Sequence, residues 1–172
     1  EVMANPFLTE LCDDLNSKSA QIARRSAQKA EDSDGRRRFV AGVLGPGTAS
    51  PSMQVDPDDE EFRAITVDQV RRNYSRQARI LIHEGADLLL IDAIYDAKSG
   101  IAALEALETI FEETGKRLPV IVSPVLGFEF ELMISADPLE SFWNQAAAFR
   151  PLAFGAAPQL RRGATIPLES WA

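Results

Sequence analysis

The segment that most constrains the fold is residues 85–96, GADLLLIDAIYD, in which a short apolar run ends in an acid and leads into a helix pattern. The uninterrupted apolar residues from Leu88 to Ile91 are typical of a strand buried on both faces, and such strands belong to parallel sheets covered by helices. Asp92 follows where this strand should end, and that end carries the chemistry in parallel α/β folds. A solvated turn acid is the plainer interpretation of Asp92.

Composition narrows the classes of protein that this chain can represent. Its 172 residues suffice for one domain with a real core. The net charge of −8 argues against a nucleic-acid partner, which would need a basic face. No apolar stretch approaches the roughly 20 residues of a membrane span, and the N-terminus shows no signal-peptide pattern. Cys12 is the only cysteine, so it can form neither an internal disulfide nor a thiolate metal site. We expect a cytoplasmic protein without membrane or nucleic-acid partners.

Helix patterns recur along the chain. Residues 66–69, TVDQ, form a capping box that starts a helix ending at Gly85. A second apolar stripe begins after Asp96, the expected N-cap, and ends at Gly115. Asp137 is the expected N-cap of a third helix with Pro138 at its first position. An earlier helix is predicted over about residues 8–29. The side chains expected to face the core are Leu11, Leu15, Ile22 and Ala23 in that earlier helix, and Phe142 and Trp143 in the third.

Short apolar runs lie between the helices, at residues 39–44, 87–91, 119–123 and 152–155. Helices alternating with strands predict a parallel sheet with right-handed crossovers. Residues 45–59 are rich in Gly, Pro, Ser and Asp, so we expect a long loop on the functional edge, the same edge as Asp92. Gly45 begins this loop, where the backbone either approaches a ligand closely or simply forms a flexible turn.

These runs resemble the homocysteine S-methyltransferase family. Residues 39–46, FVAGVLGP, are close to a strand-and-loop motif of that family, and residues 84–92, EGADLLLID, match a later strand. Further matches follow in the same order along the chain, so that the resemblance covers about residues 8–155; they are TAS (48–50), FRAIT (62–66), LPVIVS (118–123) and AFG (153–155). The best match is the N-terminal homocysteine-binding module of cobalamin-dependent methionine synthase.

The resemblance implies a TIM barrel in which zinc, held by three cysteines, activates homocysteine as a thiolate. In methionine synthase the methyl group then comes from methylcobalamin. The matched strands correspond to roughly the third to sixth of eight. The expected fold class is therefore α/β, a partial (β/α)8 barrel with about four parallel strands and outer helices. Residues 1–172 are expected to form one partial domain, in which residues 156–172 match nothing. By resemblance, Asp92, Ser123 and Gly45 bind substrate, Asp92 standing where the family usually has a glutamate.

The sequence also departs from the family pattern. Pro158 stands near the first cysteine position, and the chain ends at Ala172 before any strand that could carry the other two. We therefore expect a homocysteine S-methyltransferase-like domain that binds neither zinc nor cobalamin alone and has no catalytic residue of its own. The alternatives are a folded remnant or self-associating module without a small-molecule function, and a different α/β enzyme that uses Asp92 and the Gly45 loop without metal.

Three further expectations concern partners and minor sites. A partial barrel would leave the inner face of its strands uncovered, so the missing barrel half or a second copy of the chain is expected to cover it. His83 is expected to complement the dipole at the C-terminal end of its helix rather than to bind zinc. The acidic residues at 56–61 resemble the first ligands of a calcium loop but lack its turn glycine and closing glutamate, which favours a solvated loop.

Overall fold

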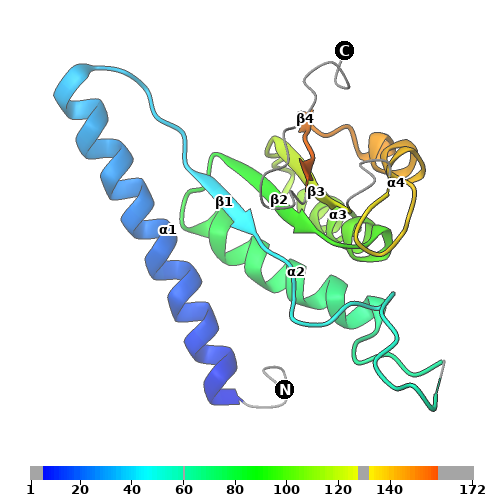
Figure 1. Ribbon diagram of the computed structural model, residues 1–172. Helices are drawn as coiled ribbons and strands as arrows, with labels where there is room; N and C mark the ends of the chain where they lie inside the picture. Colours follow the sequence, from blue (N-terminus) through cyan, green and yellow to red (C-terminus); the bar gives the residue numbers. More distant parts are fainter. Residues whose placement is uncertain (1–5, 60, 128–131, 159–172) are drawn as a thin grey trace, which may run out of the picture.

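Helices and strands alternate in the computed structural model, which describes residues 6–59, 61–127 and 132–158 (Figure 1). None of the helices within these ranges is both long and apolar enough to cross a membrane. The elements in chain order are α1 (Pro6–Asp34), β1 (Ala41–Leu44), α2 (Val67–His83), β2 (Leu88–Ile94), α3 (Ala97–Thr114), β3 (Val120–Leu126), α4 (Leu139–Ala146), the 3₁₀ helix η2 (Ala147–Phe149), β4 (Ala153–Phe154) and β5 (Ala157–Pro158).

The strands form a parallel sheet in the order β1-β2-β3-β4, which confirms the predicted topology. Ile91 in β2 pairs with Leu44 in β1 on one side and with Val122 in β3 on the other. The sequence patterns did not predict β5. This strand also runs parallel to β3, but it pairs further along, where Pro158 is opposite Leu126.

One face of the sheet carries the core, and α2, α3 and α4 pack on it (Figure 1). Side chains alternate along β2, where Leu89 and Ile91 are fully buried beneath these helices and Leu90 is half-buried on the opposite face. The opposite face corresponds to the inside of a barrel. Its edge residue Val43 is 47% exposed, so the described residues leave part of this face uncovered. The expected covering by a barrel half or a second copy stays a prediction.

The predicted inward face of α1 is wrong. Leu15 and Ile22 are 60% and 55% exposed, and Leu11 and Ala23 are also exposed. The helix instead contacts α2 and its C-terminal turn through small and polar residues: Ala20 is buried, and Ser17 Oγ donates to Glu84 at 2.7 Å. The outer surface of α2 is polar, so the polar side of α1 packs against it. None of the residues that the structure describes covers the apolar stripe of α1.

The start of α4 also differs from the prediction. Pro138, not Asp137, is its N-cap residue, and no side chain caps the helix. The Asp137 carboxylate instead accepts hydrogen bonds from the Ala97 backbone N–H at 2.9 Å and from Ser135 Oγ at 2.7 Å. Asp137 therefore satisfies a free N–H in the first turn of α3, the neighbouring helix, rather than one in α4.

The two aromatic residues predicted for the core at α4 have different environments. Phe142 is fully buried, as predicted, whereas Trp143 is 41% exposed, so its assignment to the core is wrong. The Trp143 ring packs edge-on against Phe154 of β4, with their centroids 4.7 Å apart. The helix thus anchors the sheet edge through one buried ring and one that lies at the surface.

Candidate functional site

The three residues proposed by resemblance to bind substrate lie side by side across three adjacent strands. Gly45 follows the end of β1, whereas Asp92 and Ser123 lie within β2 and β3, because β2 continues to Ile94 and does not end before Asp92 as predicted. Gly45 follows Leu44, and Leu44 pairs with Ile91. Asp92 follows Ile91, which pairs with Val122, the residue before Ser123. Asp92 and Ser123 are both half-buried, and the alternation along their strands places them on the face without helices. The topology therefore brings one backbone turn, one carboxylate and one hydroxyl to the same part of the sheet edge.

A β-bulge directly after Asp92 interrupts the alternation of side chains along β2. The pairing between β2 and β3 shifts between Ile91 and Ile94, and Ala93 adopts a φ of +53°. The extra residue turns Ile94 to the helix side, where it is 1% exposed, while Asp92 stays on the open face. A left-handed alanine costs on the order of 1 kcal/mol, and bulges often re-aim side chains beside functional sites.

The Asp92 carboxylate makes no hydrogen bond or ion pair with any residue that the structure describes. Asp96, four residues later, has a contrasting environment. It is 2% exposed and caps α3, as predicted, by accepting from the Ser99 backbone N–H at 2.9 Å. It also accepts from Ser50 Oγ at 2.9 Å and Ser52 Oγ at 3.0 Å. Asp96 is therefore a structural tie between the loop after β1 and α3, and Asp92 is the carboxylate that is available to a ligand.

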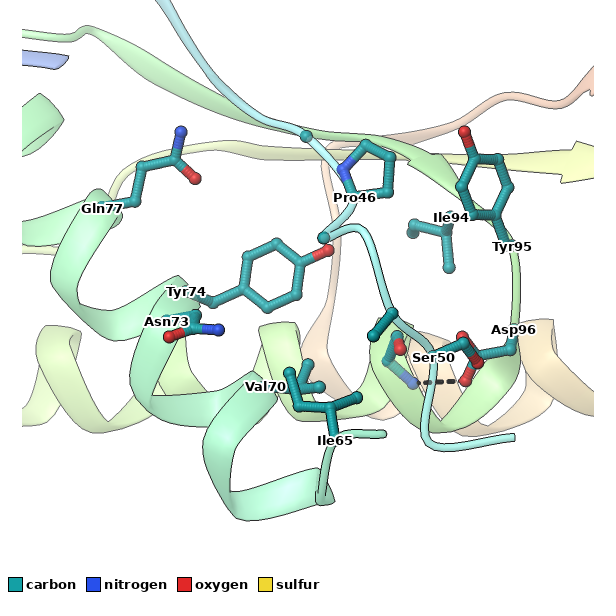
Figure 2. Close-up of a pocket in the computed structure, with 14 residues that line it drawn as sticks. Pro46, Ser50, Ile65, Val70, Asn73, Tyr74, Gln77, Ile94, Tyr95 and Asp96 are labelled. Carbon is teal, nitrogen blue, oxygen red and sulfur yellow. Dashed lines mark hydrogen bonds between the residues drawn. The ribbon is translucent and has the colours of Figure 1, made fainter. Parts of the chain in front are cut away.

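A pocket of about 240 Å³ lies beneath the loop that follows β1 (Figure 2). Gly45 and Pro46 of the loop, Val70 and Tyr74 of α2, and Ile94 of β2 form much of its wall. Gly45 thus borders both this pocket and the sheet edge, whereas Asp92 and Ser123 do not line the pocket. Sequence patterns could not predict this cavity, because its wall combines three segments that are distant along the chain.

Tyr74 gives this region a dependence on pH. Burial raises the pKa of Tyr74 from 10.0 to about 12, and the negative charge of Asp96 acts in the same direction. A raised pKa means that the folded state keeps the proton more tightly, so this contribution to stability is complete below pH 10 and falls as the pH rises toward 12. We expect it to have lost roughly 2 kcal/mol by about pH 11.5.

Urea unfolding of the wild type and of Tyr74→Phe between about pH 9 and 11.5 measures this contribution, because phenylalanine has no proton to lose. The variant should lose less stability over this range than the wild type does. Parallel pH profiles for the two proteins would show that Tyr74 titrates normally.

Metal-ligating side chains do not gather at the sheet edge. Over residues 6–59, 61–127 and 132–158, no group of three or more His, Cys, Asp or Glu side chains could hold a metal ion. Cys12 is exposed on α1, and His83 lies in the last turn of α2, 3.6 Å from Glu84. The backbone of Pro158 is beside Leu126, and a proline side chain offers no metal ligand. These residues do not fit the three-cysteine zinc site that the resemblance implies, and the expected lack of bound zinc stays a prediction.

Comparisons with known proteins extend this description. A family model described as homocysteine S-methyltransferase matches residues 2–157. The apo form of the homocysteine methyltransferase MmuM from Escherichia coli has a TM-score of 0.68 and 19% sequence identity, over 86% of this chain and 49% of that chain. Its metallated form has a TM-score of 0.65 and 22% identity, over 84% and 48%. This chain thus spans about half the length of these structures, and their likeness confirms the predicted partial barrel.

Proposed function

Because this chain belongs to the homocysteine S-methyltransferase family, we propose that it supplies the homocysteine-binding part of a methyltransferase that makes methionine. The observation that carries this proposal is the meeting of Gly45, Asp92 and Ser123 at one sheet edge, with Asp92 unpaired among the described residues. In this arrangement the Asp92 carboxylate accepts hydrogen bonds from the ammonium group of homocysteine. The Ser123 hydroxyl can donate to the carboxylate of the same substrate, and the Gly45 turn lets the ligand lie close to the backbone.

The methyl donor is the finer part of the proposal. The motifs at residues 39–46 and 84–92 support the methionine synthase type, in which the donor is methylcobalamin. We propose that this chain positions only the acceptor, since its described residues offer no zinc site that would generate the thiolate. Three cysteine ligands cannot come from these 172 residues, whose one cysteine is Cys12, so a further segment or another chain would supply them.

Asp92→Asn is expected to weaken homocysteine binding about tenfold, because the neutral amide loses the charge-assisted contact to the ammonium group. Asp92→Glu should bind homocysteine at least as tightly as the wild type, since it restores the longer carboxylate typical of the family. Isothermal titration at millimolar homocysteine measures both affinities. Asp14→Asn is the matched control, because Asp14 is an exposed carboxylate on α1 that forms an ion pair with Lys18. Equal affinities of the wild type and Asp92→Asn for homocysteine would show that Asp92 does not contribute to this site.

The isolated chain is expected to retain no stoichiometric zinc and to transfer no methyl group from methylcobalamin or a sulfonium donor. Without a metal, a thiol with a pKa of about 8.5 stays mostly protonated at neutral pH and is a poor nucleophile. Elemental analysis and an assay for methionine measure the two expectations. About one tightly held zinc per chain would contradict the first of them. Turnover that survives chelation and disappears in Asp92→Ala would instead favour a metal-free α/β enzyme.

A further inference from the structure

The pocket beneath the loop after β1 contains a polar group that the fold itself does not use. Tyr74 is 5% exposed, and its hydroxyl points from α2 toward the loop that carries Pro46 (Figure 2). This hydroxyl makes no hydrogen bond with any described residue. The hydroxyl oxygen keeps accessible surface on the side of the pocket, so a ligand that accepts a hydrogen bond from it would take the place of water and gain an orienting contact.

The position of the pocket separates it from the proposed homocysteine site. Its wall includes Val70 and Ile94, which are buried on the side of the sheet that carries the helices. Asp92 and Ser123 lie on the opposite face. A molecule in the pocket would therefore contact neither of these residues, although Gly45 borders both regions.

The charges around the pocket restrict what it can hold. No Lys, Arg or His side chain is among its lining residues, and its one charged group is the buried carboxylate of Asp96. That carboxylate already accepts three hydrogen bonds, from Ser50, Ser52 and Ser99. An anion would lie near a negative charge without a compensating cation, which is costly in a buried site. A ligand that accepts a hydrogen bond from the Tyr74 hydroxyl is therefore uncharged rather than anionic.

The volume and the apolar wall set the size of this ligand. A cavity of about 150 Å³ accommodates benzene, so the 240 Å³ here suits one ring with a small substituent. Pro46, Val70 and Ile94 provide apolar contacts for such a ring. The amide of Asn73, which is exposed on α2, offers a second polar contact from the lining.

We propose that this pocket binds a small uncharged ring compound bearing a carbonyl or amide oxygen, which accepts a hydrogen bond from the Tyr74 hydroxyl. Benzamide is the probe, and benzoate is its anionic counterpart of nearly identical shape. Ligand-observed NMR titration of the full chain should give a dissociation constant for benzamide on the order of 1 mM, as a ligand of this size can reach. Benzoate should bind at least about tenfold more weakly because of the charge of Asp96.

Variants of the pocket test the assignment. Tyr74→Phe keeps the shape of the ring and should weaken benzamide binding about fivefold to tenfold. Ala49→Leu adds volume to the pocket wall and should abolish binding, while its thermal unfolding shows whether the fold is retained. Asp92→Asn, on the other face, should leave the benzamide affinity unchanged. The proposal is overturned if benzamide does not bind at about 20 mM, if benzoate binds equally well, or if a folded Tyr74→Phe binds benzamide as tightly as the wild type.

Discussion

Replacing Gly100 by alanine is expected to destabilise the fold by about 3 kcal/mol, although alanine is the better helix former by about 1 kcal/mol. Gly100 is buried in the first turns of α3, where a Cβ atom would lie 2.6 and 2.7 Å from two ring atoms of Phe142 and 3.0 Å from the Ile94 Cγ2 atom. Phe142 is fully buried and cannot move aside without displacing α4. Overpacking should therefore outweigh the gain in helix propensity.

Chemical denaturation measures this loss, and Gly155→Ala is the matched control because no atom lies within 4 Å of its Cβ position. Phe142→Leu combined with Gly100→Ala provides the second test, since the smaller side chain relieves the clash. The double variant should be more stable than the sum of the two single effects predicts. A stability of Gly100→Ala equal to that of the wild type would mean that α3 and α4 are less closely packed than they are in this structure.

Local sequence patterns predicted the elements of this fold well, because the signals that begin and end them are local. The capping box of α2 is present with both of its hydrogen bonds, through Thr66 and Gln69. Gly115 ends α3 in the left-handed conformation that glycine tolerates best. The alternation of these elements was then sufficient to predict a parallel sheet. The same alternation predicts that Asp92 and the loop that begins at Gly45 lie on one edge, and the pairing of Leu44 with Ile91 brings them together.

The predictions that depended on a neighbour were the ones that differed from the structure. The apolar stripe of α1 was expected to face the core, but periodicity does not identify which surface a helix will contact, and α2 presents a polar one. Asp137 precedes α4 in the chain, yet its carboxylate accepts a hydrogen bond from the Ala97 backbone N–H of α3. The sequence around Ala93 contains no glycine or proline that would indicate a bulge. Residues two apart in a regular strand share a face, so the opposite orientations of Asp92 and Ile94 could not be predicted.

The buried carboxylate of Asp96 is the position where we expect the largest loss of stability, about 4 kcal/mol for Asp96→Ala. The N-cap contributes about 1 kcal/mol of this value. The remainder comes from Ser50 and Ser52, whose hydroxyls lose a charged acceptor, with the Ser50 hydroxyl left buried. Asp96→Asn keeps an oxygen for the Ser99 N–H and should lose roughly half as much.

Two measurements distinguish the loss of the Asp96 contacts between the loop and α3 from a general destabilisation of the fold. Urea unfolding gives the total loss, with Asp14→Ala as the control, because Asp14 is an exposed carboxylate in a surface ion pair of about 0–1 kcal/mol. Limited proteolysis reports the loop itself: without Asp96, residues 45–59 are no longer held to α3, so cleavage should begin there under conditions in which the wild type stays intact. If residues 45–59 of Asp96→Ala resist proteolysis, or if the free energy of unfolding falls by less than about 1 kcal/mol, other contacts hold the loop that borders both the sheet edge and the pocket.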